Sequence, residues 1–297
     1  MDERVSDLVI FDGAMGTMLL PQSKYRLPCE RLNLSHSELV ENVHRAYLHA
    51  GAQVLRTNSF AANRLSLSRY GLEEETVHIN REAVAIAHRA SVSVNVKGPV
   101  RIAGSIGPVP LSVPEFAMAS CTPESVYAEQ AEALVGAGVD MLVCETFQTA
   151  LAVAQVVAAV MPVVRRANRT IPVAVCLTPT VDSAQTADFA ASIYDTVVRD
   201  SGVGFFGFNC GTGPESIVQS IIALRGRINL PLLALPSAGV PTFTGESAVY
   251  PVGIERFCAE LSNLVNRSMV AGIGGCCGTT PAYIEALATS VGLRAAN

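Results

Sequence analysis

Short apolar segments alternate with longer segments of helical character along the whole chain. Each apolar segment is nearly continuous, which is typical of a strand buried on both faces, and each is followed by a stretch long enough for a helix. The alternation occurs eight times. The predicted strands cover residues 8–11, 53–58, 100–104, 140–145, 171–177, 204–209, 230–235 and 268–274.

Strands that alternate with helices favour a parallel sheet. Eight such units in a chain of 297 residues fit a closed (β/α)8 TIM barrel, and an open doubly wound sheet is the alternative. No linker, charged block or low-complexity segment divides the chain. We therefore predict an α/β fold with a single (β/α)8 barrel domain over residues 1–297.

Local signals mark the starts of two of the predicted helices. Ser35 lies three residues before Glu38, a spacing that predicts a capping box. Thr122 is followed by Pro123, and proline is favoured in the first helical turn. Both positions agree with helices that follow the predicted strands.

Polar residues and glycines gather just beyond the predicted strands. In a TIM barrel the catalytic groups lie at the C-terminal ends of the strands, so these segments are the expected site. They are Asp12-Gly13-Ala14-Met15-Gly16-Thr17, Arg56-Thr57-Asn58-Ser59, Gly104-Ser105-Ile106-Gly107-Pro108, Cys144-Glu145-Thr146, Asn209-Cys210, Pro236-Ser237-Ala238-Gly239 and Cys276-Cys277.

Three cysteines occupy two of these strand ends. Cys210 follows the sixth strand, and Cys276 and Cys277 follow the eighth, where flanking glycines permit both side chains to face one point. Three thiolates leave one position of a tetrahedral zinc open, as in catalytic zinc sites. Burial as small hydrophobic side chains is the usual fate of a free cysteine, but three at one rim favour zinc. The other five cysteines are assigned to packing or to incidental positions.

Two carboxylates lie at strand ends. Glu145 ends an apolar segment, where burial without a partner would be costly, so it is either a counter-charge for a substrate amine or a structural hydrogen-bond acceptor. Asp12 either caps the turn formed with Gly13 and Gly16 or faces a ligand. The glycines of that turn can expose backbone N–H groups to a bound carboxylate.

Composition and charge exclude several classes of partner. The net charge is −5 and no basic cluster occurs, so neither nucleic acid nor an anionic membrane is an expected partner. The longest apolar stretch, residues 150–164, is too short to span a bilayer. The N-terminus lacks a signal-peptide core, and eight cysteines without a secretion signal indicate the reducing cytoplasm. We therefore expect a soluble cytoplasmic protein.

The combination of these groups indicates a thiol substrate. Three anionic sulfurs blunt the Lewis acidity of zinc, so the metal is better suited to bind a fourth thiol, which it deprotonates. A buried carboxylate and backbone donors at the same rim fit the ammonium and carboxylate of an amino acid. Together they describe an amino thiol that is alkylated at sulfur.

The sequence resembles the homocysteine S-methyltransferase family over essentially its whole length, and within it most closely the cobalamin-dependent methionine synthase branch. The motifs that carry the resemblance are Asp12-Gly13-Ala14-Met15-Gly16-Thr17, Thr57-Asn58-Ser59-Phe60, Gly104-Ser105-Ile106-Gly107-Pro108, Glu145-Thr146, Gly207-Phe208-Asn209-Cys210 and Gly274-Gly275-Cys276-Cys277-Gly278-Thr279-Thr280-Pro281. The last two are specific in combination. The branch that uses S-methylmethionine tends to have arginine where this chain has Gly278.

The resemblance implies a zinc-dependent methyltransferase of methionine biosynthesis that methylates L-homocysteine. It assigns the zinc to Cys210, Cys276 and Cys277, which act in catalysis through the metal. It assigns substrate contacts to Asp12, to residues 13–17, to Asn58 and to Glu145. Ser237 is included because many members have asparagine there, near the metal, and the resting fourth ligand is therefore open.

The resemblance also bears on the methyl donor. No Asp-x-His-x-x-Gly motif occurs in the 297 residues, so methylcobalamin is expected on a corrinoid partner protein or as free cofactor. S-methylmethionine, S-adenosylmethionine and a betaine-type onium are the alternative donors, and another thiol or a selenol is an alternative acceptor. A non-catalytic zinc barrel that serves as a subunit of a corrinoid complex is the rival of a different class.

Overall fold

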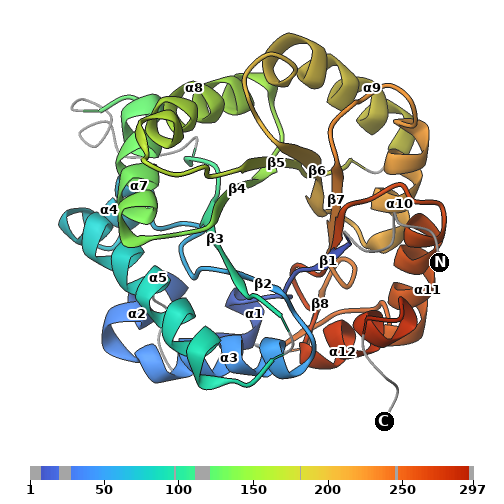
Figure 1. The fold of residues 1–297 in the computed structure, drawn as a ribbon, viewed down its shortest axis with the longest axis horizontal. Helices are drawn as coiled ribbons and strands as arrows, with labels where there is room; N and C mark the ends of the chain where they lie inside the picture. The colour runs from blue at the N-terminus through green and yellow to red at the C-terminus, as the bar shows by residue number, and fades with distance from the viewer. Residues whose placement is uncertain are drawn as a thin grey trace.

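The strands form a parallel ring that is surrounded by helices (Figure 1). The computed structural model describes residues 8–19, 28–96, 98–110, 121–180, 182–244 and 247–293. Eight parallel strands pair in the order β1-β10-β7-β6-β5-β4-β3-β2. They are β1 Val9–Ile10, β2 Val54–Arg56, β3 Arg101–Ile106, β4 Met141–Phe147, β5 Val173–Leu177, β6 Phe205–Cys210, β7 Leu232–Pro236 and β10 Gly272–Ile273.

The two end strands of this order also meet. A parallel bridge joins Phe11 to Val54, and the Gln53 N–H donates to the Ile10 carbonyl at 2.7 Å. The sheet therefore closes on itself, and the predicted (β/α)8 barrel is confirmed. Each of the eight predicted strands overlaps an observed one.

Helices follow the strands and cover the outside of the ring (Figure 1). The principal helices are α3 Ser37–His49, α5 Thr76–Ser93, α7 Pro123–Ala137, α8 Ala150–Arg166, α9 Ser183–Ile193, α10 Pro214–Ala223, α11 Ile254–Asn266 and α12 Pro281–Ser290. Shorter elements are α1 Gly16–Leu19, α2 Leu32–Ser35, α4 Arg64–Ser68, the 3-10 turns Cys29–Arg31 and Glu73–Glu75, and a π-helical turn Tyr194–Val198.

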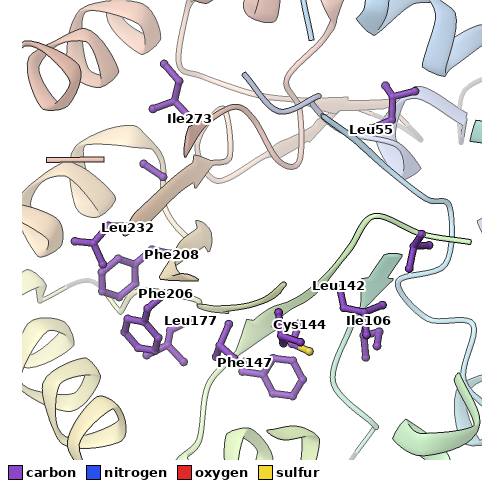
Figure 2. Packing of buried hydrophobic residues seen from close by; sticks show 14 of the residues in the cluster. Leu55, Ile106, Leu142, Cys144, Phe147, Leu177, Phe206, Phe208, Leu232 and Ile273 are labelled. Atoms are coloured by element: carbon purple, nitrogen blue, oxygen red, sulfur yellow. The ribbon is translucent and has the colours of Figure 1, made fainter. Parts of the chain in front are cut away.

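Alternate residues of each strand enter two separate hydrophobic cores. On β4, Leu142 and Cys144 face the helices, whereas Met141 and Val143 fill the barrel interior. Figure 2 shows the outer set, which includes Cys144, between the strands and the helices. Because successive side chains on a strand point to opposite faces, Glu145 lies on the inner side, at the rim.

The local predictions had mixed outcomes. Thr122 caps α7, accepts a hydrogen bond from the Ser125 N–H and precedes Pro123 at the first turn, so that start is confirmed. The prediction of a capping box at Ser35 is wrong. Ser35 is the last residue of α2, its hydroxyl donates back to the Arg31 carbonyl, and α3 begins only after the break at His36.

An antiparallel hairpin follows β7, and the alternation of apolar segments did not predict it. Its strands are β8 Thr242–Thr244 and β9 Ser247–Val249. All three residues of β8 are exposed, so no buried face marks this strand in the sequence.

None of the helices in the described ranges combines the length and the apolar character that crossing a membrane requires.

Gly207 on β6 offers a test of the barrel packing. A Cβ atom at this position would lie 2.2 Å from the Leu233 carbonyl oxygen on β7, and backbone cannot move aside as a side chain can. We expect Gly207→Ala to lower the free energy of unfolding by about 2–3 kcal/mol. Urea unfolding followed by circular dichroism measures the change.

Gly136 provides the matched control for that substitution. It is exposed on α7, and an added Cβ would meet no atom within 4 Å. Gly136→Ala should therefore stabilise the protein by about 0.5–1 kcal/mol through helix propensity. Equal effects of the two substitutions would contradict the packing described for β6 and β7.

Candidate functional site

A cavity of about 480 Å³ lies at the C-terminal ends of the barrel strands. Its wall combines the last residues of strands β2, β3, β4 and β6 with segments that follow β1, β2 and β10. The lining residues are 13–17, Cys29, Glu30, 56–60, Ser105, Glu145, Thr146, Cys210, Cys276 and Cys277. Residues far apart in the sequence therefore share one chamber at the rim where a TIM barrel carries its chemistry.

Three sulfur atoms meet on this wall. The Sγ atoms of Cys210, Cys276 and Cys277 all lie within 4.8 Å of one another, and each residue is half-buried. In the described ranges no further histidine, cysteine, aspartate or glutamate joins the group. Three convergent thiols with access from the cavity fit a thiophilic metal with one coordination position left for a ligand.

The end of β7 holds the two cysteine-bearing segments together. The Ser237 N–H donates to the Cys210 carbonyl at 3.0 Å, and the Ala238 N–H donates to the Cys277 carbonyl at 2.9 Å. The Cys276 N–H donates to the Pro236 carbonyl at 2.7 Å. Because β10 ends at Ile273, Cys276 and Cys277 lie on a turn beyond the strand. Their side chains are therefore not required to point to opposite faces, as successive side chains on a strand are.

Cys210 has an unusual backbone conformation. Its φ is 62°, in the left-handed region that a residue with a Cβ rarely adopts. The Ser237 hydroxyl braces the following residue by donating to the Gly211 carbonyl at 2.9 Å. Strain of this kind is retained where the surrounding structure imposes it, and here it turns Cys210 out of β6 towards the other two sulfurs.

The three thiols hold their protons tightly without a cation. Hydrogen bonds within the group have the largest influence and act in both directions, and with the effect of burial the pKa of Cys210 and Cys276 rises to about 12 and that of Cys277 to about 11. All three are therefore thiols at neutral pH unless a cation displaces the protons.

A buried arginine, Arg56, also lines the cavity. Arg56 ends β2, and its Nε donates to Asp12 Oδ1 at 2.8 Å while its Nη1 donates to Glu145 Oε2 at 2.8 Å. The backbone N–H of Arg56 donates to the other Asp12 oxygen at 2.8 Å. Burial alone would lower the pKa of Arg56, but the charges of Glu145 and Asp12 outweigh it and raise that pKa.

Burial also changes the proton affinity of Asp12. It raises the pKa of this carboxyl to about 6, although the contacts with Arg56 act in the opposite direction. Both carboxylate oxygens accept hydrogen bonds from Arg56. Asp12 is therefore committed to the arginine and does not line the cavity.

Glu145 has partners on both oxygens and still borders the cavity. The Ser105 hydroxyl donates to Oε1 at 2.5 Å, and Oε2 also lies 3.4 Å from Asn209 Nδ2. The same Asn209 amide donates to the Thr146 hydroxyl at 2.7 Å and lies 3.8 Å from Cys276 Sγ. Asn209 thus connects the carboxylate to the sulfur group.

The turn after β1 is fastened to the segment that follows the paired cysteines. The Tyr47 hydroxyl lies 2.7 Å from the Ala14 carbonyl and 2.9 Å from the Thr279 carbonyl. The Gly278 N–H donates to the Thr17 hydroxyl at 3.2 Å. The backbone donors of residues 13–17 therefore keep a fixed position relative to the sulfurs.

The predicted site residues divide into two groups. Ten of them line the cavity: Gly13, Ala14, Met15, Gly16, Thr17, Asn58, Glu145, Cys210, Cys276 and Cys277. Asp12 and Ser237 do not line the cavity. Both carboxylate oxygens of Asp12 accept hydrogen bonds from Arg56, and the hydroxyl of Ser237 donates to the Gly211 carbonyl.

Several lining residues were not predicted as site residues, and Arg56 is the most consequential. Its place at the end of the second predicted strand was the only available signal. Cys29, which was assigned to an incidental position, also borders the cavity.

Gly278 has no room for a side chain. Its φ is 79°, and a Cβ atom would lie 2.2 Å from the ring of Tyr250. Tyr250 follows the β8–β9 hairpin, so the ring fills the space beside the paired cysteines from the β7 side of the rim. An arginine at position 278 would require this ring to move.

Comparison with known proteins places the chain in a family. Residues 9–291 match the sequence profile described as homocysteine S-methyltransferase. The chain is 29% identical over 296 residues to the methionine synthase of Mycobacterium tuberculosis and 28% identical to that of Mycobacterium leprae. Each alignment covers 96% of this chain but 24% of the relative, so the chain spans about a quarter of the length of these methionine synthases.

Solved structures share the architecture. The homocysteine methyltransferase MmuM from Escherichia coli in its metallated form superposes with a TM-score of 0.71 at 24% identity, over 95% of both chains. Its apo form gives a TM-score of 0.69 at 25% identity, over 96% of both chains.

The structure is a closed (β/α)8 barrel whose rim carries three convergent cysteines and the buried carboxylate of Glu145 in one cavity. The chain belongs to the homocysteine S-methyltransferase family, so the family resemblance noted in the sequence is confirmed.

Metal binding at the three sulfurs should depend steeply on pH. Since the thiol pKa values of about 11 and 12 lie well above neutrality, binding Zn²⁺ through three thiolates releases up to three protons. The apparent dissociation constant should therefore rise by up to about 1,000-fold for each unit by which the pH falls between 8 and 6. Competition with a chromophoric chelator measures this slope.

Calorimetry in two buffers of different ionisation enthalpy counts the released protons directly. Cys210→Ser should reduce the count by one, whereas Cys121→Ser, outside the sulfur group, should leave it unchanged. A pH-independent dissociation constant would rule out binding through thiolates.

Proposed function

We propose that this protein methylates the thiol of L-homocysteine with the help of zinc, and that a methylcorrinoid carried outside this barrel supplies the methyl group. The observation that carries the proposal is the composition of the cavity wall. This wall presents three sulfurs, the carboxylate of Glu145 and the glycine-rich turn of residues 13–17.

The substrate has a natural orientation in this cavity. The thiol lies against Cys210, Cys276 and Cys277, and the ammonium group lies against Glu145. The substrate carboxylate faces the backbone of residues 13–17, since consecutive N–H groups of a glycine-rich turn bind anions. The cavity volume of about 480 Å³ suits a small ligand of this kind.

The donor set of the site supports zinc. Thiolates are preferred zinc ligands, and three of them with an open fourth position resemble catalytic rather than structural sites. Zinc bound there would lower the pKa of a coordinated thiol, so that a thiolate nucleophile exists at neutral pH. The chain's own residues hold the amino-acid part of the substrate and so direct its sulfur towards the donor methyl group.

The displacement needs no acid or base beyond the activated sulfur. The substrate sulfur forms a bond to the methyl carbon while the bond from that carbon to its carrier breaks, and the electron pair stays with the carrier. In a methylcorrinoid the carrier is cobalt, and in an onium donor it is sulfur or nitrogen. The sequence of residues 277–281 and the likeness to methionine synthases support the corrinoid donor.

The wider setting is part of the same proposal. We take residues 1–297 as one homocysteine-binding domain. We assign it to the cytoplasm, because three reduced thiols are needed at the site. A non-catalytic zinc barrel would not need the carboxylate and the turn that share the cavity.

Zinc content and coordination test the site. We expect one zinc per chain. Loss of a residue that only supports a metal ligand weakens binding by about 10–100-fold, so loss of a ligand itself, in Cys210→Ser or Cys277→Ser, should weaken zinc binding by more than about 100-fold. Adding L-homocysteine to the zinc-loaded wild-type protein should add a fourth sulfur in X-ray absorption at the zinc edge.

Cys121→Ser is the control and should keep both results, since Cys121 is not part of the sulfur group. An unchanged zinc stoichiometry in both site variants would contradict the assignment of zinc to these cysteines. No change at the zinc edge on adding homocysteine would favour the non-catalytic barrel.

A donor panel tests the methyl source. Methylcobalamin, S-methylmethionine, S-adenosylmethionine and betaine are each incubated with zinc-loaded protein and homocysteine, and methionine is measured by chromatography. We expect the highest rate with methylcobalamin and no methionine above background with Cys277→Ser. Turnover with S-methylmethionine alone would replace the proposed donor while leaving the site intact.

A further inference from the structure

Arg56 contacts the buried carboxylate pair, the turn after β1 and the residue that precedes Cys276. We propose that Arg56 is a positioning residue that fixes the amine-binding carboxylate, the carboxylate-binding turn and the sulfur-bearing loop relative to one another, and so makes the enzyme selective for thiols that carry an amine. This inference deepens the function proposed above and rests on it.

The side chain of Arg56 is only 8% exposed, so its guanidinium depends on the protein for its partners. Nε and Nη1 bridge Asp12 and Glu145 at 2.8 Å each. Nη2 faces three backbone carbonyls, those of Asp12 at 3.3 Å, Gly13 at 3.0 Å and Gly275 at 2.5 Å. These partners come from the ends of β1, β4 and β10, and Arg56 itself ends β2.

Two of these partners adjoin the functional groups directly. Gly13 begins the turn that faces the cavity, and Gly275 immediately precedes Cys276. One planar group therefore sets the distance between the amino-acid end of the cavity and its sulfur end. A lysine has a single point of charge and cannot span two carboxylates and three carbonyls in this way.

The charges of the cluster favour an ammonium ligand. Two carboxylates and one guanidinium, when ionised, leave one net negative charge in a buried site. Glu145 is the member of the carboxylate pair that borders the cavity. A single ammonium group neutralises the cluster, whereas a thiol without an amine leaves it uncompensated.

The test compares two ligands that differ only in the amine. L-homocysteine and 4-mercaptobutanoate are titrated into zinc-loaded protein by calorimetry. Wild type should prefer homocysteine by about 30-fold or more, in line with a charge-assisted contact. Arg56→Gln and Arg56→Lys should each weaken homocysteine binding at least about tenfold and change 4-mercaptobutanoate binding much less, so that the preference collapses.

Arg64→Gln is the matched control. Arg64 also bridges two carboxylates, Glu74 and Glu129, but it lies on α4 outside the cavity. Its loss should leave the preference intact. Asp12→Asn is the second site variant, since it keeps the shape of the cluster, and it should reduce the preference even if the arginine variants fail to fold.

The outcomes separate the two proposals. Failure of wild type to bind homocysteine would overturn the proposed function and this inference with it. If wild type shows the preference and all the Arg56 and Asp12 variants keep it, only the role of Arg56 is overturned. Equal weakening of both ligands and of zinc binding in these variants would assign Arg56 to the fold alone.

Discussion

Three backbone hydrogen bonds at the end of β7 are the constraint on which the site depends. Pro236, Ser237 and Ala238 lie between the sixth and the eighth units of the barrel, and they bind the backbone of all three cysteines that share the rim. The closed ring makes this possible, because the parallel order β10-β7-β6 places one strand end between the two sulfur-bearing loops. The sulfurs therefore converge through main-chain geometry, and their side chains remain available to a ligand.

The cavity has two ends with opposite electrostatic requirements. At one end the thiols keep their protons until a cation displaces them, so binding of a metal there requires the release of protons. At the other end Arg56 holds two buried carboxylates, one of which borders the cavity. Asn209 connects the ends, since its amide reaches both Glu145 and Cys276. A ligand with a thiol and an ammonium group satisfies both requirements at once.

The sequence was sufficient for the barrel and for the positions of its rim residues, because strand burial and alternation are local patterns. Cys210, Cys276, Cys277 and Glu145 could be placed at strand ends without knowledge of the fold. The ion pair between Asp12 and Arg56 could not be predicted from the sequence. It depends on the register between β1 and β2, which the bridge between Phe11 and Val54 sets where the barrel closes. The capping box predicted at Ser35 was wrong because Ser35 belongs to a short preceding helix, α2, which the sequence pattern did not reveal.

Gly278 links the motif of the paired cysteines to the packing around it. In the sequence it distinguishes this chain from the S-methylmethionine branch, and in the structure the Tyr250 ring occupies the space that a side chain at 278 would need. The ring is carried by the segment after the β8–β9 hairpin, and the charges of all three cysteines contribute to the raised pKa of its hydroxyl, after burial. Both the φ of 79° at Gly278 and the Tyr250 ring therefore exclude a side chain at this position, so the packing beside the paired cysteines depends on the glycine as much as the turn itself does. Because the ring already fills the space, a larger residue at position 278 requires a different residue at position 250 or a shift of the segment that carries it.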